Sequence, residues 1–288
     1  MKISVVTNAF NQGRFLRRCM SSVLSHSDID LEYIVVDPGS TDKTSEILSE
    51  YENSGEPRLK ILREPDNGPA DGLNNGFAAA TGEWFIYLNA DDFFLPGALN
   101  KGLQAIATNP GADCIYGDGY LTDIDGTPTR RVISTPFSAE GFVFRRCLVL
   151  QQSTFYKAES FHKLGGFNVE NRTSWDAEIL LDMCLADMYL VHVRGFWSAF
   201  VIHGESITGS QRHAVESKKN HERMFKKVMG RERTVADLKR IQRIRLQDRL
   251  LNPGATLVRL LDALNLGGLP NISAGLPPIE SDEKATSV

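Results

Sequence analysis

The feature that most constrains the fold is a regular alternation of apolar runs and helical segments over the first 110 residues. Four runs rich in β-branched and aromatic residues predict strands at 3–7, 31–37, 59–64 and 83–92. Helical spacing predicts helices at 16–26, 43–55, 73–82 and 96–110, the second of them capped by Ser40 and Thr41. Strands that alternate with helices favour a mainly parallel central sheet flanked by helices, which is a Rossmann-like α/β fold.

The second half of the chain is less regular. We expect a hairpin around Asp125-Gly126, a strand followed by a helix over 151–167, an amphipathic helix over 174–188 and strand-rich sequence over 189–204. From Arg212 to Leu250 the sequence is helical and basic, with thirteen Lys or Arg against five Asp or Glu. We therefore divide the chain into domain 1–211, with parts 1–110 and 111–211, a basic helical extension 212–266 and a flexible tail 267–288.

Composition excludes several classes of function. The net charge of −4 argues against a general nucleic-acid binder, and no run of about 20 apolar residues predicts a membrane span. The first strand is followed by "NAFNQG", which has one glycine and no P-loop lysine, so a dinucleotide oxidoreductase or a P-loop NTPase is disfavoured. The four scattered cysteines and the absence of a signal peptide favour reduced thiols in a cytoplasmic protein.

Two adjacent carboxylates, Asp91 and Asp92, follow the fourth predicted strand. Parallel sheets bind ligands beyond the carboxyl ends of their strands, and Thr7 and Asp37 end two further strands at the same edge. The repulsion between the two carboxylates would be relieved by a divalent cation, and hard oxygen ligands suit Mg²⁺ or Mn²⁺ together with substrate phosphates. A turn or a helix cap is the alternative interpretation of the pair, and charge alone does not distinguish one diphosphate ester from another.

Three segments together resemble a known family. They are "ISVVTNAFNQGRFLRRCMSSVLSH…LEYIVVDPGSTDKTSEIL", "EPDNGPADGLNNGFAAATGEWFIYLNADD" and "GGFNVENRTSWDAEILL". In this order they are similar to the family 2 glycosyltransferases of GT-A fold, over about residues 1–210. The resemblance implies a nucleotide-sugar-binding part at 1–110 and an acceptor part at 111–211, followed by the helical C-terminal extension.

The resemblance also implies roles for residues on the donor side. The donor-binding set is Thr7, Asn8, Asp37, Asp66, Asp71, Asn89 and Asp91. Pro38 replaces the second acid of the family's "DDGSTD" motif and Asn89 replaces the first acid of its DxD motif. We expect the metal, Mn²⁺ or Mg²⁺, to rest mainly on Asp92, with Asp91 second and His203 completing the shell. A structural histidine is the alternative for His203.

On the acceptor side, Asp176 matches the catalytic base of the family. It lies near the start of a predicted helix, where the helix dipole favours a carboxylate, so a purely capping role is the alternative. The resemblance places Gln152 and Trp175 beside the acceptor, and Glu178 is expected to be a supporting or acceptor contact. Trp175 is equally well explained by core packing.

The resemblance implies an inverting glycosyltransferase that moves one sugar from a nucleotide-diphospho-sugar, most simply a UDP-sugar, to an acceptor hydroxyl. The hexosyl or N-acetylhexosaminyl type fits polysaccharide, lipopolysaccharide or glycolipid assembly. The QxxRW motif of processive synthases is missing, which favours addition of a single sugar. A sugar nucleotidyltransferase and a non-catalytic nucleotide-sugar-binding module remain the competing interpretations.

The basic segment 212–250 has two expected partners. It is suited to peripheral contact with anionic lipid at the inner face of the cell membrane, which would help with a lipid-linked acceptor. Alternatively, its leucines form a homodimer interface, built from Leu246, Leu250, Leu251, Leu257, Leu260 and Leu261. A solvated helical face needs neither partner.

Overall fold

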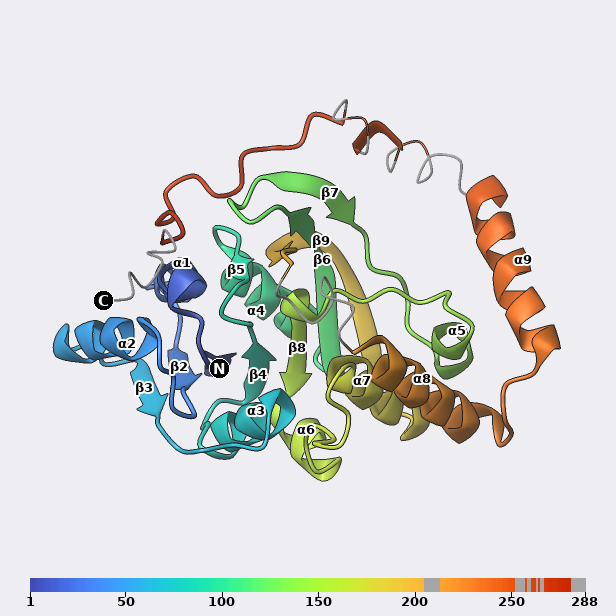
Figure 1. Ribbon diagram of the computed structural model, residues 1–288, viewed down its shortest axis with the longest axis horizontal. Helices are drawn as coiled ribbons and strands as arrows, with labels where there is room; N and C mark the ends of the chain where they lie inside the picture. Colours follow the sequence, from blue (N-terminus) through green and yellow to red (C-terminus); the bar gives the residue numbers. More distant parts are fainter. Residues whose placement is uncertain (205–212, 252–256, 258–259, 263, 265–266, 281–288) are drawn as a thin grey trace, which may run out of the picture.

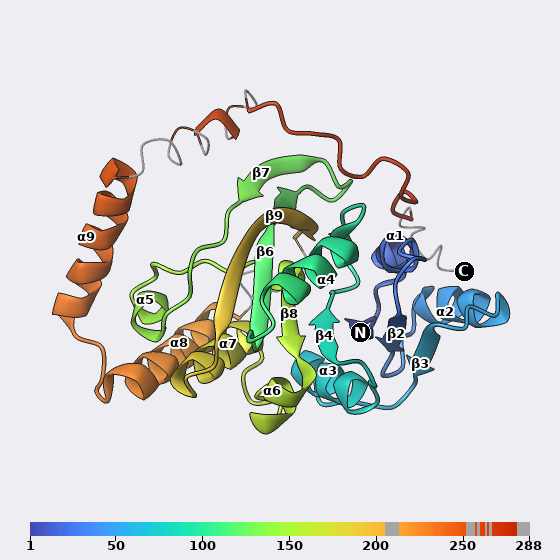
Figure 2. The same cartoon turned by 180° about the vertical axis from the view of Figure 1, so that it is seen from behind.

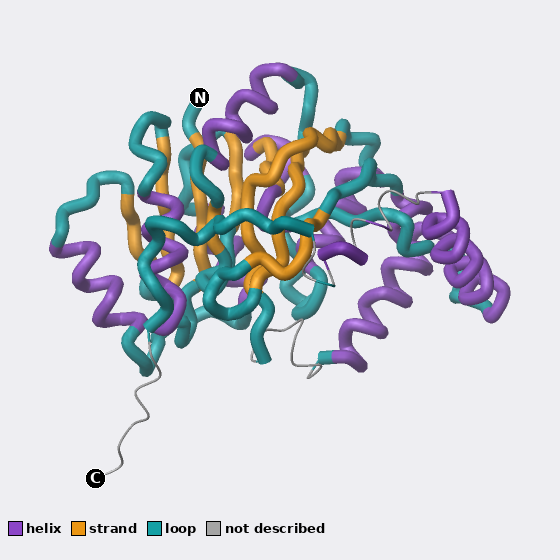
Figure 3. The backbone as a smooth tube through the Cα atoms, turned by 90° about the horizontal axis from the view of Figure 1, so that it is seen from above, coloured by secondary structure: helices purple, strands orange, loops and turns teal. Residues whose placement is uncertain are grey.

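The computed structural model describes residues 1–204, 213–251, 257, 260–262, 264 and 267–280. One nine-stranded sheet runs through the molecule with helices against both of its faces (Figures 1 and 3). The strand order is β3-β2-β1-β4-β8-β6-β9-β5, with β7 paired to β6. The sheet therefore continues from the regular first half of the chain into the irregular second half without a break.

The first half has the alternating order that the sequence predicts. Its elements are β1 (Ile3–Asn8), α1 (Gly13–Leu24), β2 (Leu31–Val36), α2 (Thr44–Asn53), β3 (Leu59–Leu62), α3 (Pro69–Ala78), β4 (Trp84–Tyr87), β5 (Phe93–Phe94) and α4 (Ala98–Thr108). β3, β2, β1 and β4 pair in parallel, which confirms the parallel sheet for this half. The two-residue strand β5 was not predicted, because it exists only by pairing with a distant strand.

Two local predictions in this half are wrong. Helix α3 begins at Pro69, four residues before the predicted start at Leu73, because Pro69 occupies the first helical turn, where its missing N–H costs nothing. Ser40 and Thr41 do not cap α2. Instead the Asp42 carboxylate accepts from the Thr44 N–H at 2.9 Å.

The second half contributes strands of both directions. Its elements are β6 (Cys114–Thr122), β7 (Pro128–Val132), α5 (Ala139–Val143), the 3₁₀ turn η1 (Gln151–Ser153), β8 (Thr154–Lys157), α6 (Ala158–Lys163), α7 (Trp175–Leu185) and β9 (Leu190–Val201). The predicted hairpin is confirmed by antiparallel β6 and β7. Because β8 is antiparallel to both β4 and β6, and β9 is parallel to β6, the carboxyl ends of β4, β6 and β9 lie at one edge.

The side chains of each strand alternate between two cores. Helices α1, α2 and α4 cover one face of the sheet, while α3, α6 and α7 cover the other. Helix α7 buries residues around most of its circumference rather than along one stripe, so its predicted amphipathic character is wrong. The C-terminal extension contacts this helix through ion pairs of Arg223 with Glu178 and of Lys227 with Asp182.

The extension folds back onto the rest of the protein. It contains α8 (Ala214–Met229), which lies beside α7, and α9 (Val235–Leu251), which projects from one side (Figures 1 and 2). A small core joins α5, α8 and α9 through Phe144, Phe225 and Ile241. Segment 267–280, expected to be a flexible tail, crosses back to α1, where Arg17 pairs with Glu280 at 2.6 Å. None of the described helices has the length and apolar character needed to cross a membrane.

Candidate functional site

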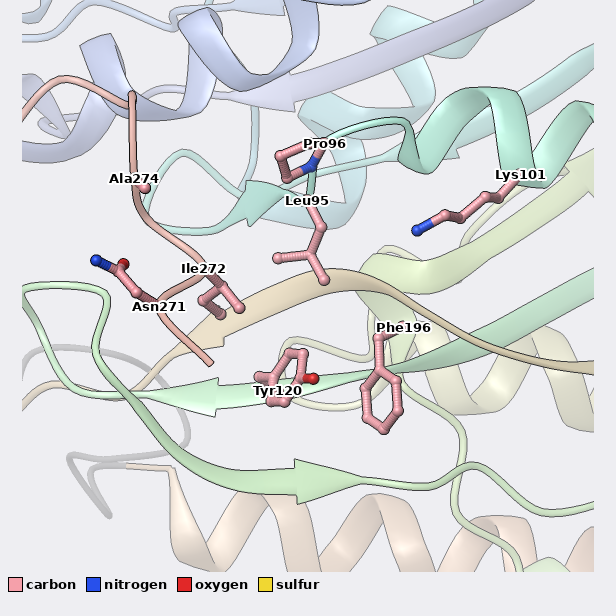
Figure 4. A pocket seen from close by; sticks show the side chains of 8 residues that line it. All are labelled: Leu95, Pro96, Lys101, Tyr120, Phe196, Asn271, Ile272 and Ala274. Atoms are coloured by element: carbon pink, nitrogen blue, oxygen red, sulfur yellow. The ribbon is translucent and has the colours of Figure 1, made fainter. Parts of the chain in front are cut away.

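The carboxyl edge of the sheet brings together most of the residues singled out from the sequence. Asn8 ends β1, Asp91 and Asp92 follow β4, and His203 follows β9. A cavity of about 300 Å³ lies elsewhere, between the start of α4, the paired strands β6 and β9 and residues 271–274 (Figure 4). The candidate site therefore lies at the strand ends and not in that cavity.

Asp92 is an interior residue of this edge. Its side chain is fully buried, and its two oxygens accept hydrogen bonds from the Val201 N–H at 2.9 Å and the Gln152 Nε2 at 2.7 Å. Asn89 donates a third hydrogen bond at 3.1 Å. Burial, and then the neighbouring Asp91, raise the pKa of Asp92 well above its usual value. This carboxylate ties together the ends of β4, η1 and β9, and has no face left toward a ligand.

Asp91 is the carboxylate that faces outward. Its side chain is 14% exposed, and one of its oxygens lies 3.0 Å from His203 Nε2. Phe15 of α1 packs against the His203 ring, with 4.8 Å between the ring centroids. The described residues contain no group of three His, Cys, Asp or Glu side chains arranged as a metal site. One carboxylate and one imidazole do fit a divalent cation whose remaining ligands are substrate phosphates and water.

A second polar group lies where β1 meets α3. Asn8 Nδ2 donates to the Pro69 carbonyl at 2.7 Å, while its Oδ1 is buried with no hydrogen-bond partner among the described residues. A Cβ on Gly72 would lie 2.4 Å from Asp66 Oδ2 and 3.0 Å from Asn8 Oδ1, so only glycine lets these side chains approach the helix. Burial, and then Asp71, raise the pKa of Asp66. An unpartnered amide oxygen beside a carboxylate suits a ligand that donates hydrogen bonds, such as a ribose or a base.

Three residues expected to contact the donor form hydrogen bonds with other residues of the protein. Thr7 is fully buried and accepts from the Tyr33 hydroxyl at 3.1 Å. Asp37 is buried and stabilises its own turn by accepting from the N–H and the hydroxyl of Ser40. Asp71 lies in the first turn of α3 rather than in a loop, and accepts from Asn67. Asp37 and Thr7 therefore shape the edge from inside.

Asp176 lies in the first turn of α7 and is partly exposed. Burial by surrounding protein raises its pKa, while its own backbone N–H, the Ala177 N–H and the charge of His221 act in the opposite direction. Burial raises the pKa values of the Tyr87 and Tyr156 hydroxyls, and the charge of Asp176 adds to both shifts. A carboxylate with a raised pKa at a helix start has the properties of a general base.

The three predicted acceptor residues are packed inside. Gln152 is buried and donates a hydrogen bond to Asp92. Trp175 of α7 packs in the core between this helix and the sheet. Glu178 is 2% exposed and is held by Asn168, Asn171 and Arg223. The supporting role expected for Glu178 fits this geometry. Sequence reasoning did not identify Arg223, which lies 45 residues away in the basic segment.

Comparisons with known proteins place this geometry in context. The family model described as glycosyl transferase family 2 matches residues 4–165. The chain is 31% identical over 180 residues to a PGL/p-HBAD biosynthesis glycosyltransferase of Mycobacterium bovis, covering 61% of this chain and 68% of that protein. It is 25% identical over 233 residues to a chondroitin synthase of Pasteurella multocida, covering 80% of this chain and 23% of that protein. The chain spans 38% or less of the first three curated relatives.

Two solved structures share the fold. S. aureus TarS 1–349 in complex with UDP-GlcNAc aligns with a TM-score of 0.62 and 16% identity, covering 92% of this chain and 79% of that chain. Mannosyltransferase PcManGT from Pyrobaculum calidifontis, in complex with GDP-Man and Mn²⁺, aligns with a TM-score of 0.61 and 16% identity, covering 93% of this chain and 76% of that chain. At these identities the likeness concerns the fold, and it confirms the predicted GT-A arrangement with a helical C-terminal region.

Proposed function

Because the chain belongs to glycosyl transferase family 2, we propose that it transfers one sugar from a nucleotide-diphospho-sugar to an acceptor hydroxyl with inversion at the anomeric carbon. The observation that carries this proposal is the pair Asp91 and His203, 3.0 Å apart at the carboxyl edge of the sheet, with 14% and 7% of their side chains exposed. Asp176, in the first turn of helix α7, has a pKa raised by burial and is the proposed base. The pair suits the diphosphate end of a donor, and the base suits the acceptor.

In the proposed reaction, the Asp176 carboxylate accepts the proton of the acceptor hydroxyl as the oxygen attacks the anomeric carbon. The new bond forms on the face opposite the leaving group, while the bond between that carbon and the diphosphate oxygen breaks with its electron pair. A Mn²⁺ or Mg²⁺ ion held by Asp91 and His203 would supply positive charge to the leaving diphosphate. Asp92 stabilises this edge of the sheet from the interior by accepting hydrogen bonds from Val201 and Gln152.

We propose a metal assignment that differs from the one expected from the sequence. Asp92 is buried with three hydrogen bonds, so Asp91 becomes the principal carboxylate ligand in the proposal. The imidazole of His203 favours Mn²⁺ over Mg²⁺, because Mg²⁺ prefers ligand shells made of oxygen. Asn8 and Asp66 are proposed to contact the nucleoside through the unpartnered Asn8 Oδ1 and the Asp66 carboxylate.

A saccharide or a lipid-linked sugar is the proposed acceptor, and a UDP-sugar is the first donor to test. The outer side of α9 exposes Leu238 and Leu246 beside Lys239 and Arg243, a combination suited to the surface of an anionic membrane. The proposed leucine dimer is only partly visible, because the side chains of Leu250 and Leu251 lie outside the described residues.

Titration calorimetry with UDP, GDP and dTDP, each with and without Mn²⁺, tests the donor site. We expect one nucleotide to bind at least tenfold more tightly with Mn²⁺ than without it. The matching sugar donors are then screened for release of the nucleoside diphosphate. Metal-enhanced binding without turnover of any donor would favour a binding module, and no binding of any nucleotide would overturn the proposed function.

A further inference from the structure

We propose that helix α8 is part of the acceptor side of the site, and that Arg223 is the residue that positions Asp176, acting through Glu178. This inference rests on the proposed function and adds a residue to it from the C-terminal extension. The family model ends at residue 165, so both α7 and α8 lie beyond the part of the chain that it matches. The role of Arg223 therefore comes from contacts in this structure alone.

Arg223 makes a two-point contact with a buried carboxylate. Its Nη2 donates to Glu178 Oε2 at 2.7 Å and its Nη1 donates to Oε1. Asn171 Nδ2 donates to the same carboxylate at 2.7 Å, and Asn168 Nδ2 lies 3.2 Å from both of its oxygens. A bidentate guanidinium–carboxylate contact fixes both distance and orientation, which one ammonium group does not.

A second contact reaches the turn from which α7 begins. Asn220, one turn before Arg223 on α8, donates to Asn171 Oδ1 at 2.8 Å and to Thr173 Oγ1 at 3.0 Å. The same Asn171 oxygen accepts from the Ser174 N–H at 3.0 Å, immediately before the first residue of α7. Helix α8 thus holds both the entry to α7 and the carboxylate in its first turn.

These contacts fix the direction in which Asp176 points. Asp176 and Glu178 are two positions apart, so they face different sides of a helix that turns about 100° per residue. Glu178 is anchored to α8, which leaves Asp176 on another side of the same turn. If Arg223 is lost, the first turn of α7 can rotate or fray, and Asp176 moves with it. Displacement of a catalytic group by about 1 Å can cost on the order of 100-fold in rate.

Arg223 also compensates the charge of Glu178, which lies two positions after the base on α7. The titratable groups that interact electrostatically with Asp176 are Tyr87 from β4, Tyr156 from β8 and His221 from α8. With Arg223 present, the charge of Glu178 is compensated. Without it, a buried negative charge remains two residues from Asp176 and disfavours the ionised base.

Four variants test the proposal: Arg223→Gln, Arg223→Lys, the double variant Glu178→Gln/Arg223→Gln, and the control Lys227→Ala. Lys227 pairs with Asp182 across the same two helices, in an exposed position one turn further along α8, so its loss weakens the interface without touching Glu178. Each protein is measured for UDP and GDP binding with Mn²⁺, and for nucleoside diphosphate release from UDP-GlcNAc and GDP-mannose across a pH series. Circular dichroism on melting reports the folded fraction.

We expect Arg223→Gln to lower kcat about 10- to 100-fold while the nucleotide Kd stays within about twofold. In this variant the acid limb of the kcat/KM profile shifts to a pH about 0.5–1 unit higher, because the uncompensated negative charge of Glu178 disfavours ionisation of Asp176. Arg223→Lys loses less activity. The double variant returns the acid limb to the wild-type position, since the pair is then neutral, and this variant also serves if Arg223→Gln does not fold. Lys227→Ala behaves as the wild type.

Two results would overturn the positioning role while leaving the proposed function intact. One is a folded Arg223→Gln variant with wild-type kcat and an unmoved acid limb. The other is a loss of kcat in Lys227→Ala as large as that in Arg223→Gln. This result would mean that the Arg223–Glu178 contact only stabilises the interface between α7 and α8. An acid limb that stays displaced in the double variant would refute the charge argument. No diphosphate release by the wild-type protein would instead overturn the proposed function, and the role of Arg223 with it.

Discussion

Asp92 and its neighbour Asp91 are predicted to differ in their effects on stability and on metal binding. Asp92→Ala removes a fully buried acceptor and leaves the Val201 N–H and the Gln152 amide without a partner. An unsatisfied buried donor costs about 1–3 kcal/mol, so two of them cost about 2–6 kcal/mol. Burying the Asp92 carboxylate is itself unfavourable, as its raised pKa shows. Removing this carboxylate therefore offsets part of the lost stability. We therefore expect a net loss of about 2–4 kcal/mol in the free energy of unfolding.

Asp91→Ala is the matched control. Its carboxylate is 14% exposed and contacts His203, so we expect stability within about 1 kcal/mol of the wild type. Nucleotide binding with Mn²⁺ should be affected more by Asp91→Ala than by Asp92→Ala. Asp91→Ala should lose the Mn²⁺ enhancement of nucleotide binding, whereas the folded fraction of Asp92→Ala should retain most of it.

Urea unfolding followed by circular dichroism measures the first effect, and calorimetry with and without Mn²⁺ measures the second. A loss of 2–4 kcal/mol corresponds to a melting temperature lowered by roughly 4–16 °C, at about 2–4 °C per kcal/mol for a chain near this size. The reasoning is refuted if Asp92→Ala is as stable as the wild type, or if Asp92→Ala loses the metal enhancement while Asp91→Ala keeps it.

Two further predictions follow from raised pKa values. Burial raises the pKa of Asp176 above the usual 3.8 of an aspartate, so the deprotonated base is lost at a higher pH, and kcat/KM should fall as the pH drops through that raised value; a profile that stays flat down to about pH 4 would contradict this. Burial also raises the pKa of Cys19 to about 12. At pH 8 we therefore expect Ellman's reagent to modify only the half-buried Cys147 and Cys184 in the native protein, and all four thiols in the denatured one, whereas rapid reaction of four native thiols would refute the burial.

The alternating half of the fold could be predicted from sequence because its signals are local. The β-branched runs around Val5 and Val35 and the helices between them carry their own periodicity. The position of β9 depends on pairing with β6, which no local pattern encodes. The early start of α3 was signalled by Gly68-Pro69, a breaker pair that also marks a helix start.

The sequence predicts which strand ends form the candidate site, but it does not show which of their side chains face the interior. "NADD" follows strand β4, where the sequence predicts a site. Asp92 points inward and bonds to Gln152 and Val201, and no local pattern shows this because these partners are 60 and 109 residues away in the chain. The sequence predicts Glu178 only as a helix residue near the base. Its contact with Arg223 of α8 is visible only in the folded chain. Contacts of this kind arise from tertiary packing, so single-sequence patterns identify the residues and not their partners.

The most direct test of the account is the Asp176→Asn variant, compared with the wild type under the donor that the screen identifies. The substitution keeps the size and polarity of the side chain but removes the base. We expect nucleotide binding within about twofold of the wild type and a loss of at least about 100-fold in sugar transfer, because general-base catalysis contributes roughly 10²–10⁴-fold. Full transfer activity in a folded Asp176→Asn variant would contradict the central assignment.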